Sequence, residues 1–79
     1  MGWDIYEGRH RYELVANALR YQIQEGVYRP GDRLPQQHEL ARMHNVSFNT
    51  LKSALDILEK EGYVVRKVGV GTYASLPDQ

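Results

Sequence analysis

A short segment near the middle of the chain places hydrogen-bonding, apolar and charged side chains close together: Ser47, Phe48, Asn49, Thr50, Lys52 and Ser53. An asparagine amide offers the donor and acceptor that match an adenine edge, and a phenylalanine ring can cover the methyl group of thymine. Lysine and threonine suit phosphate oxygens, which position a protein without reporting sequence. The segment therefore predicts recognition of double-stranded DNA with an A·T-containing half-site, read by Asn49 and Phe48.

Each of these side chains also has a purely structural alternative. Phe48 can fold back into the core, and Asn49 can be a solvated residue at the start of a helix. Lys52 can pair with Asp56, which lies four residues further along the same helix. Both readings of the segment are open at the level of sequence.

Two further polar clusters are candidates for the same surface. The first comprises Gln36, Gln37 and His38. They stand where a helix is predicted to begin, and free backbone N–H groups at a helix N-terminus attract phosphate. The second comprises Arg66, Lys67, Gly69 and Gly71. Its cations suit phosphate and its glycines allow close approach to a groove, although a solvated helix start and a solvated hairpin would use the same residue types.

Composition excludes several other classes of function. The 79 residues contain no cysteine, and His10, His38 and His44 lack the spacing of a zinc site, so we expect no metal and no cofactor. No nucleophile has a base at a telling spacing, and we expect no catalytic residue. No apolar run approaches the roughly 20 residues of a membrane span, and no secretory signal is visible, which predicts a cytoplasmic protein without membrane contact. The formal net charge is zero, whereas most DNA-binding domains are basic.

Three helices must position these candidates. A stripe with helical spacing begins at Tyr12 and continues through Val15, Leu19 and Ile23 until Gly26 ends it. Pro30 and Gly31 then predict a type II turn. A second helix follows Leu34–Pro35 and runs to about His44, with Leu40, Ala41 and Met43 on its inner face. After Asn45, in a left-handed conformation, Ser47 caps a third helix that runs to about Glu61 and buries Leu51, Ala54, Leu55 and Leu58.

The pattern changes to a two-residue period after Gly62. Residues 63–68 and 72–74 are β-prone and flank the turn Gly69–Val70–Gly71, which predicts a hairpin with a basic, glycine-containing tip. Two helices joined by a turn of about four residues form a helix-turn-helix. We therefore predict a mainly α winged helix-turn-helix, with three helices plus a wing over residues 12–74, an N-terminal arm over 1–11, and a tail or linker start over 75–79.

The order of these signals resembles the N-terminal domain of the GntR family of bacterial transcription regulators. The run GVYRPGDRLP at residues 26–35 is similar to the family's turn between its first two helices, and Glu39-Leu40-Ala41 follows at the family's spacing. The matching positions further along are Val46-Ser47, Thr50, Ala54-Leu55, Leu58, Glu61-Gly62 and the run GVGTY at residues 69–73. The resemblance covers about residues 10–74.

This resemblance implies a dimeric regulator, more often a repressor, in which the third helix enters the major groove and the wing touches the minor groove or backbone. In such families a separate C-terminal domain usually binds a small-molecule effector, so an effector is expected only if such a domain is missing from this chain. The chain is then either a fragment or a small stand-alone regulator.

Three positions depart from the family pattern. The family's serine-glutamate-arginine before Glu39 is Gln36-Gln37-His38, and the arginine after Val46-Ser47 is Phe48. A second family arginine is Lys52. The usual arginine-to-guanine readout therefore does not transfer to this sequence. A winged-helix module that binds protein and never touches DNA is the alternative, since neutrality and the missing arginines both favour it.

Overall fold

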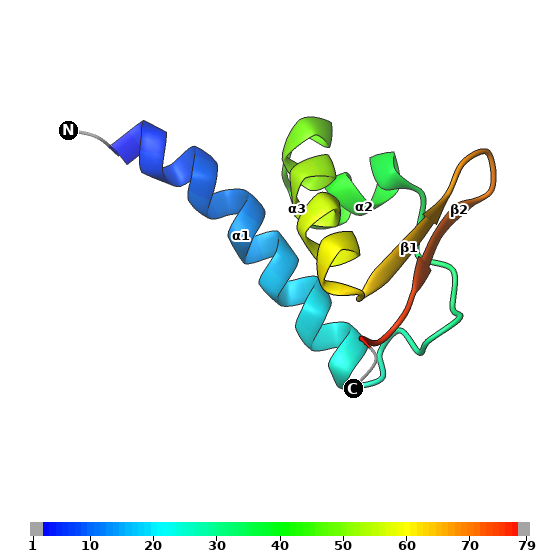
Figure 1. Ribbon diagram of the computed structural model, residues 1–79. Coiled ribbons are helices and arrows are strands. Elements are labelled where there is room, and N and C mark those ends of the chain that lie inside the picture. The colour runs from blue at the N-terminus through cyan, green and yellow to red at the C-terminus, as the bar shows by residue number, and fades with distance from the viewer. Residues whose placement is uncertain (1–2, 78–79) are drawn as a thin grey trace.

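The computed structural model describes the backbone of residues 3–77 and the side chains of residues 11–77. Three helices precede a two-stranded antiparallel hairpin, in the order α1 (Trp3–Gln24), α2 (Gln37–Met43), α3 (Phe48–Glu61), β1 (Val64–Lys67) and β2 (Gly71–Ala74) (Figure 1). This order confirms the predicted winged helix-turn-helix. The outermost residues of the predicted arm and tail, 1–2 and 78–79, lie outside the described part.

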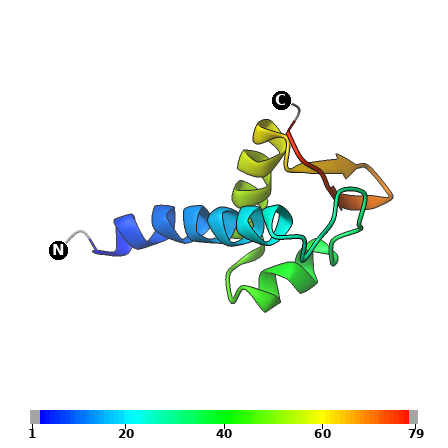
Figure 2. The same ribbon diagram turned by 90° about the horizontal axis from the view of Figure 1, so that it is seen from below.

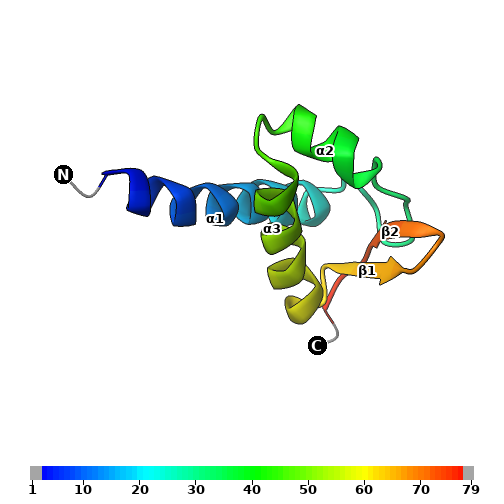
Figure 3. The same ribbon diagram turned by 90° about the horizontal axis from the view of Figure 1, so that it is seen from above.

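Helix α1 begins at Trp3, so the predicted start at Tyr12 is wrong. Its N-terminal half extends beyond the rest of the domain, as the views from below and above both show (Figures 2 and 3). A helix already nucleated by packing gains one hydrogen bond for each residue added, and continuing it does not require an apolar stripe. The predicted arm is therefore helical in its described part, while its status as a separate unit stays a prediction.

The core lies where α1, α3 and β1 meet. Helix α1 contributes Val15, Ala16, Leu19 and Ile23, α3 contributes the four predicted residues, and Val64 of β1 closes one side, all buried. On α2, Leu40 and Ala41 are buried as predicted, whereas Met43 is 55% exposed and its assignment to the inner face is wrong. At about 100° per residue, Met43 lies well outside the sector between Leu40 and Ala41.

Two turns hold the helices at their angles. Gly31 has a φ of +95° and the Asp32 amide donates to the Arg29 carbonyl at 2.8 Å, which confirms the type II turn at Pro30–Gly31. Asn45 has a φ of +58° between α2 and α3, confirming the left-handed residue that turns the chain inside the helix-turn-helix. The remaining short turn gives α2 and α3 their crossed arrangement (Figure 3).

The wing is joined to the segment before α2 by backbone pairing that the sequence did not predict. Within the hairpin, Val64 pairs with Ala74 and Lys67 with Gly71. An isolated antiparallel bridge links Arg33 to Tyr73, and the Leu34 amide donates to the Thr72 carbonyl at 2.8 Å. Residues 31–34 thus run along β2 as a third, short extended segment and attach the hairpin to the helix-turn-helix.

The two helices of the motif begin differently. At α3 the Ser47 hydroxyl accepts a hydrogen bond from the Thr50 amide at 3.1 Å, which confirms the predicted cap. At α2 the cap residue is Gln36, whose side chain makes no capping hydrogen bond. The serine-type cap of α2 is therefore absent, as the departure from the family pattern predicted.

Ser47→Ala should lower the free energy of unfolding by about 1 kcal/mol, because it leaves the first turn of α3 without its side-chain acceptor. Gln36→Ser should raise it by a few tenths to about 1 kcal/mol, because it supplies the acceptor that α2 lacks. Urea denaturation of both variants against the parent protein measures these changes. Opposite signs support the difference between the helix starts, and equal effects would contradict it.

Candidate nucleic-acid interface

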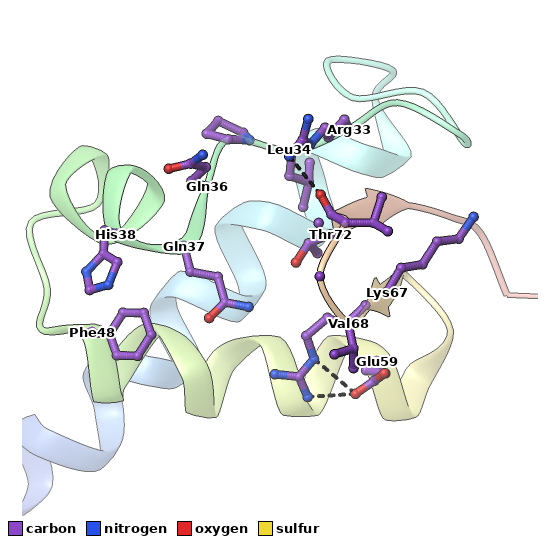
Figure 4. A pocket seen from close by; sticks show the side chains of 15 residues that line it. Arg33, Leu34, Gln36, Gln37, His38, Phe48, Glu59, Lys67, Val68 and Thr72 are labelled. Carbon is purple, nitrogen blue, oxygen red and sulfur yellow. Dashed lines mark hydrogen bonds and ion pairs between the residues drawn. The ribbon is translucent and has the colours of Figure 1, made fainter.

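A groove of about 680 Å³ runs between the helix-turn-helix and the wing (Figure 4). The start of α2 and Phe48 form one side, residues 66–72 of the wing form the other, and Arg33 and Leu34 lie at the junction. Segments far apart in sequence meet here because residues 31–34 pair with β2.

The groove brings together most of the residues singled out in the sequence. Its lining includes Gln36, Gln37, His38, Phe48, Arg66, Lys67, Gly69 and Gly71. The other predicted residues do not line it but belong to the first turns of α3 or its cap: Ser47, Asn49, Thr50, Lys52 and Ser53. Asn49, Lys52 and Ser53 are exposed, as expected for the side of α3 opposite its buried leucines.

His38 and Phe48 stack across the helix-turn-helix. Their ring centroids are 4.3 Å apart with an interplanar angle of 15°, and the rings lie face to face between α2 and α3 (Figure 4). Phe48 is half-buried, so neither the fully buried nor the fully exposed alternative describes it. Two positions that carry arginine in the family pattern are thus occupied by one aromatic pair.

The cations of α3 and the wing lie next to aromatic rings. The Lys52 Nζ is 5.9 Å from the centroid of Phe48, and the Lys67 Nζ is 4.9 Å from that of Tyr73. Such contacts stabilise exposed cations by about 0.5–1 kcal/mol and leave the charge accessible to solvent. The expected pairing of Lys52 with Asp56 is absent from the ion pairs of the described residues.

Arg66 has a different environment from the one predicted. Its guanidinium forms ion pairs with Asp56 and Glu59 of α3, with an Nη2–Oε1 distance of 2.6 Å to Glu59. Burial would lower the pKa of Arg66, but the hydrogen bonds and negative charges of Glu59 and Asp56 outweigh it and raise the pKa. Arg66 therefore links the wing to α3.

Sequence reasoning missed Arg33. Its Nη2 donates to the Val70 carbonyl of the wing tip at 2.7 Å, although 37 residues separate them in sequence. The local pattern assigned residue 33 to the turn before α2, and only the pairing with β2 brings it to the wing. No signal within a short window could have indicated this contact.

The described residues contain no group of three or more potential metal ligands, and no described helix is long and apolar enough to cross a membrane. A smaller hollow of about 190 Å³ lies between α1 and the turn before α3, and His44 lines it. Burial lowers the pKa of His44 from its ordinary value of 6.5.

Comparison with known proteins gives a consistent result. Residues 11–74 match the profile described as bacterial regulatory proteins, gntR family. The chain belongs to the GntR family.

Its relatives include the histidine utilization repressor of Klebsiella aerogenes, 42% identical over 66 residues, which cover 84% of this chain and 27% of the relative. The Exu regulon transcriptional regulator of Escherichia coli is 39% identical over 70 residues, covering 89% and 27%. The chain thus spans about a quarter of the length of these two relatives. This GntR-family domain also resembles the solved structure of AraR(DBD) in complex with operator ORX1, with a TM-score of 0.79, 26% identity, and coverage of 82% of this chain and 78% of that one.

The pKa of His44 makes stability depend on pH. Above pH 6.5 its imidazole is neutral in both the folded and the unfolded chain. As the pH falls below 6.5, the unfolded chain binds a proton that the folded chain does not, so stability decreases until the lower folded pKa is reached. His44→Gln should lose less stability between about pH 7.5 and 5.5, where carboxylates remain ionised. Urea midpoints across this range measure the difference, and an unchanged slope in the variant would contradict the assignment.

Proposed function

We propose that this domain binds double-stranded DNA with sequence preference, as the DNA-binding part of a bacterial transcription regulator that acts in the cytoplasm, most naturally as a repressor. The observation that carries the proposal is the grouping of the start of α2, the start of α3 and the wing around one groove. The resemblance to AraR(DBD), whose structure is of a complex with an operator, supports the same use of this fold.

Helix α3 is the element that enters the major groove in this proposal. The major groove is about 12 Å wide and accommodates one helix. Burial of Leu51 and Leu55 leaves Asn49 and Ser53 on the outer side of α3, where they can reach base edges. Asn49 pairs with adenine, and the ring of Phe48, held by His38, covers an adjacent thymine methyl group.

Contacts to the DNA backbone come from both sides of the groove. Lys52 and Thr50 of α3 and the amides of Gln36 and Gln37 face phosphates on the helix-turn-helix side. The Thr50 hydroxyl already accepts a hydrogen bond from the Ser47 hydroxyl at 2.9 Å, so it offers phosphate its own proton. On the wing side, Lys67 and the backbone at Gly69 and Gly71 approach the minor groove.

A homodimer supplies the affinity that one small module lacks. Single DNA-binding modules bury only about 600–1,000 Å² of protein surface, and two copies related by a two-fold axis read paired half-sites. A protein-binding role without DNA contact is the second candidate, because the ion pairs of Arg66 and the zero net charge favour it.

Selection of bound duplexes from a random pool at near-physiological salt should enrich a motif with two-fold symmetry that contains A·T pairs. Binding should weaken steeply as salt rises, because each phosphate contact releases counterions. A motif without two-fold symmetry would contradict the dimer. Complete absence of DNA binding at low salt would contradict the proposed function and favour protein interaction.

Asn49→Ala should remove the preference at one base pair, costing about tenfold or more on the preferred duplex and little on the duplex with that pair changed. Lys52→Ala, its matched control on the same helix, should weaken both duplexes equally. Fluorescence anisotropy with the two duplexes gives the four ratios. Equal losses on both duplexes for Asn49→Ala would show that Asn49 does not read a base.

A further inference from the structure

Two arginines adjoin the wing, and their environments differ. We infer that Arg33, and not Arg66, is the arginine that contacts the DNA backbone beside the wing, and that Arg66 is a positioning residue that fixes the wing to α3. The inference rests on the proposed function, because it specifies how the same groove holds DNA.

Arg33 combines an anchored position with an available charge. Its guanidinium donates to the Val70 carbonyl at 2.7 Å, and its backbone bridges to Tyr73 of β2. A guanidinium has five N–H donors, so this hydrogen bond leaves most of them for a ligand. Among the ion pairs formed by the described side chains, none involves Arg33, and the residue is exposed at the edge of the groove.

The wing tip is built to let Arg33 approach. A Cβ at Gly71 would lie 2.8 Å from the Arg33 Nε and 3.4 Å from its Cζ, closer than carbon packs against these atoms without displacement. Gly71 also has a φ of +151°, a conformation that side-chain-bearing residues rarely adopt. Gly71 therefore keeps the space in which the guanidinium lies against the hairpin.

Arg66 has the opposite balance of charge. Its side chain is only 24% exposed and is paired with the carboxylates of Asp56 and Glu59. On α3, Asp56 lies on the same outer side as Asn49 and Ser53, so its negative charge would otherwise face the DNA. Arg66 thus neutralises acidic groups at the interface and has little charge to offer a phosphate.

The rest of the wing tip increases the importance of Arg33. Val68 is fully exposed and Val70 is half-exposed, so the tip itself presents apolar side chains. With Arg66 paired, Lys67 is the other cation of residues 64–74. Arg33 supplies the wing with a charge that its own sequence lacks.

Salt dependence of DNA binding distinguishes the two roles, because each lost phosphate contact reduces the slope of log affinity against log salt by about 0.9. Arg33→Gln should show this reduction. Arg33→Lys keeps the charge and should keep the slope, but it should bind more weakly because it loses the fork-shaped contact that positions the group. The double variant Glu59→Gln with Arg66→Gln leaves the net charge unchanged and should keep the parent slope.

Lys60→Gln, at the far end of α3, controls for the loss of one positive charge and should also keep the slope. Circular dichroism establishes that each variant is folded, and the loss of the Arg66 ion pairs should appear as a lower melting temperature. An unchanged slope in Arg33→Gln, or a reduction of about 0.9 in the double variant, would overturn the inference. Absence of DNA binding by the parent protein would instead refute the proposed function, and the inference with it.

Discussion

Burial of one stripe of α3 determines where the remaining functional groups can lie. Leu51, Leu55 and Leu58 are fully buried against α1, α2 and β1. A helix that buries one sector must expose the opposite one, and in α3 that sector carries Asn49 and Ser53. Phe48 lies at the border of the two sectors, which is why it is half-buried and can stack on His38. The same apolar contacts that stabilise the domain therefore orient its polar surface.

Much of this arrangement follows from short-range rules. The stripes of α1 and α3, the cap at Ser47, and the turns at Gly31 and Asn45 each depend on residues within one or two turns of chain, and the structure confirms them. The start of α1 was not predictable in this way, because helix continuation needs no distinctive pattern. Met43 failed for a related reason, since a seven-residue helix is too short for its spacing to define a face.

Contacts between distant segments were beyond the reach of the sequence. Arg66 was expected on DNA from its place in a basic hairpin, but its partners Asp56 and Glu59 lie on another element. Arg33 was overlooked because a turn residue gains its role only when residues 31–34 pair with β2. In both cases the type of side chain was visible, whereas its neighbours depended on the tertiary fold.

A neutral chain can still present a suitable surface for DNA. Acidic side chains on α3 are paired with Arg66, and Glu61 at its end is paired with Arg20 of α1 at 2.7 Å. Intramolecular pairing of this kind removes carboxylates from the interface without changing the total charge. The formal net charge of zero therefore describes the composition and not the field at the groove.

Mapping backbone and arginine side-chain NMR shifts during titration with a duplex at low salt tests the location of the interface most directly. The largest changes should fall on the first turns of α3, the start of α2, the Arg33 guanidinium and residues 67–71 of the wing. The exposed face of α1 and the Arg66 guanidinium should change little. Changes concentrated on α1, or none at the wing, would show that DNA does not bind in the groove.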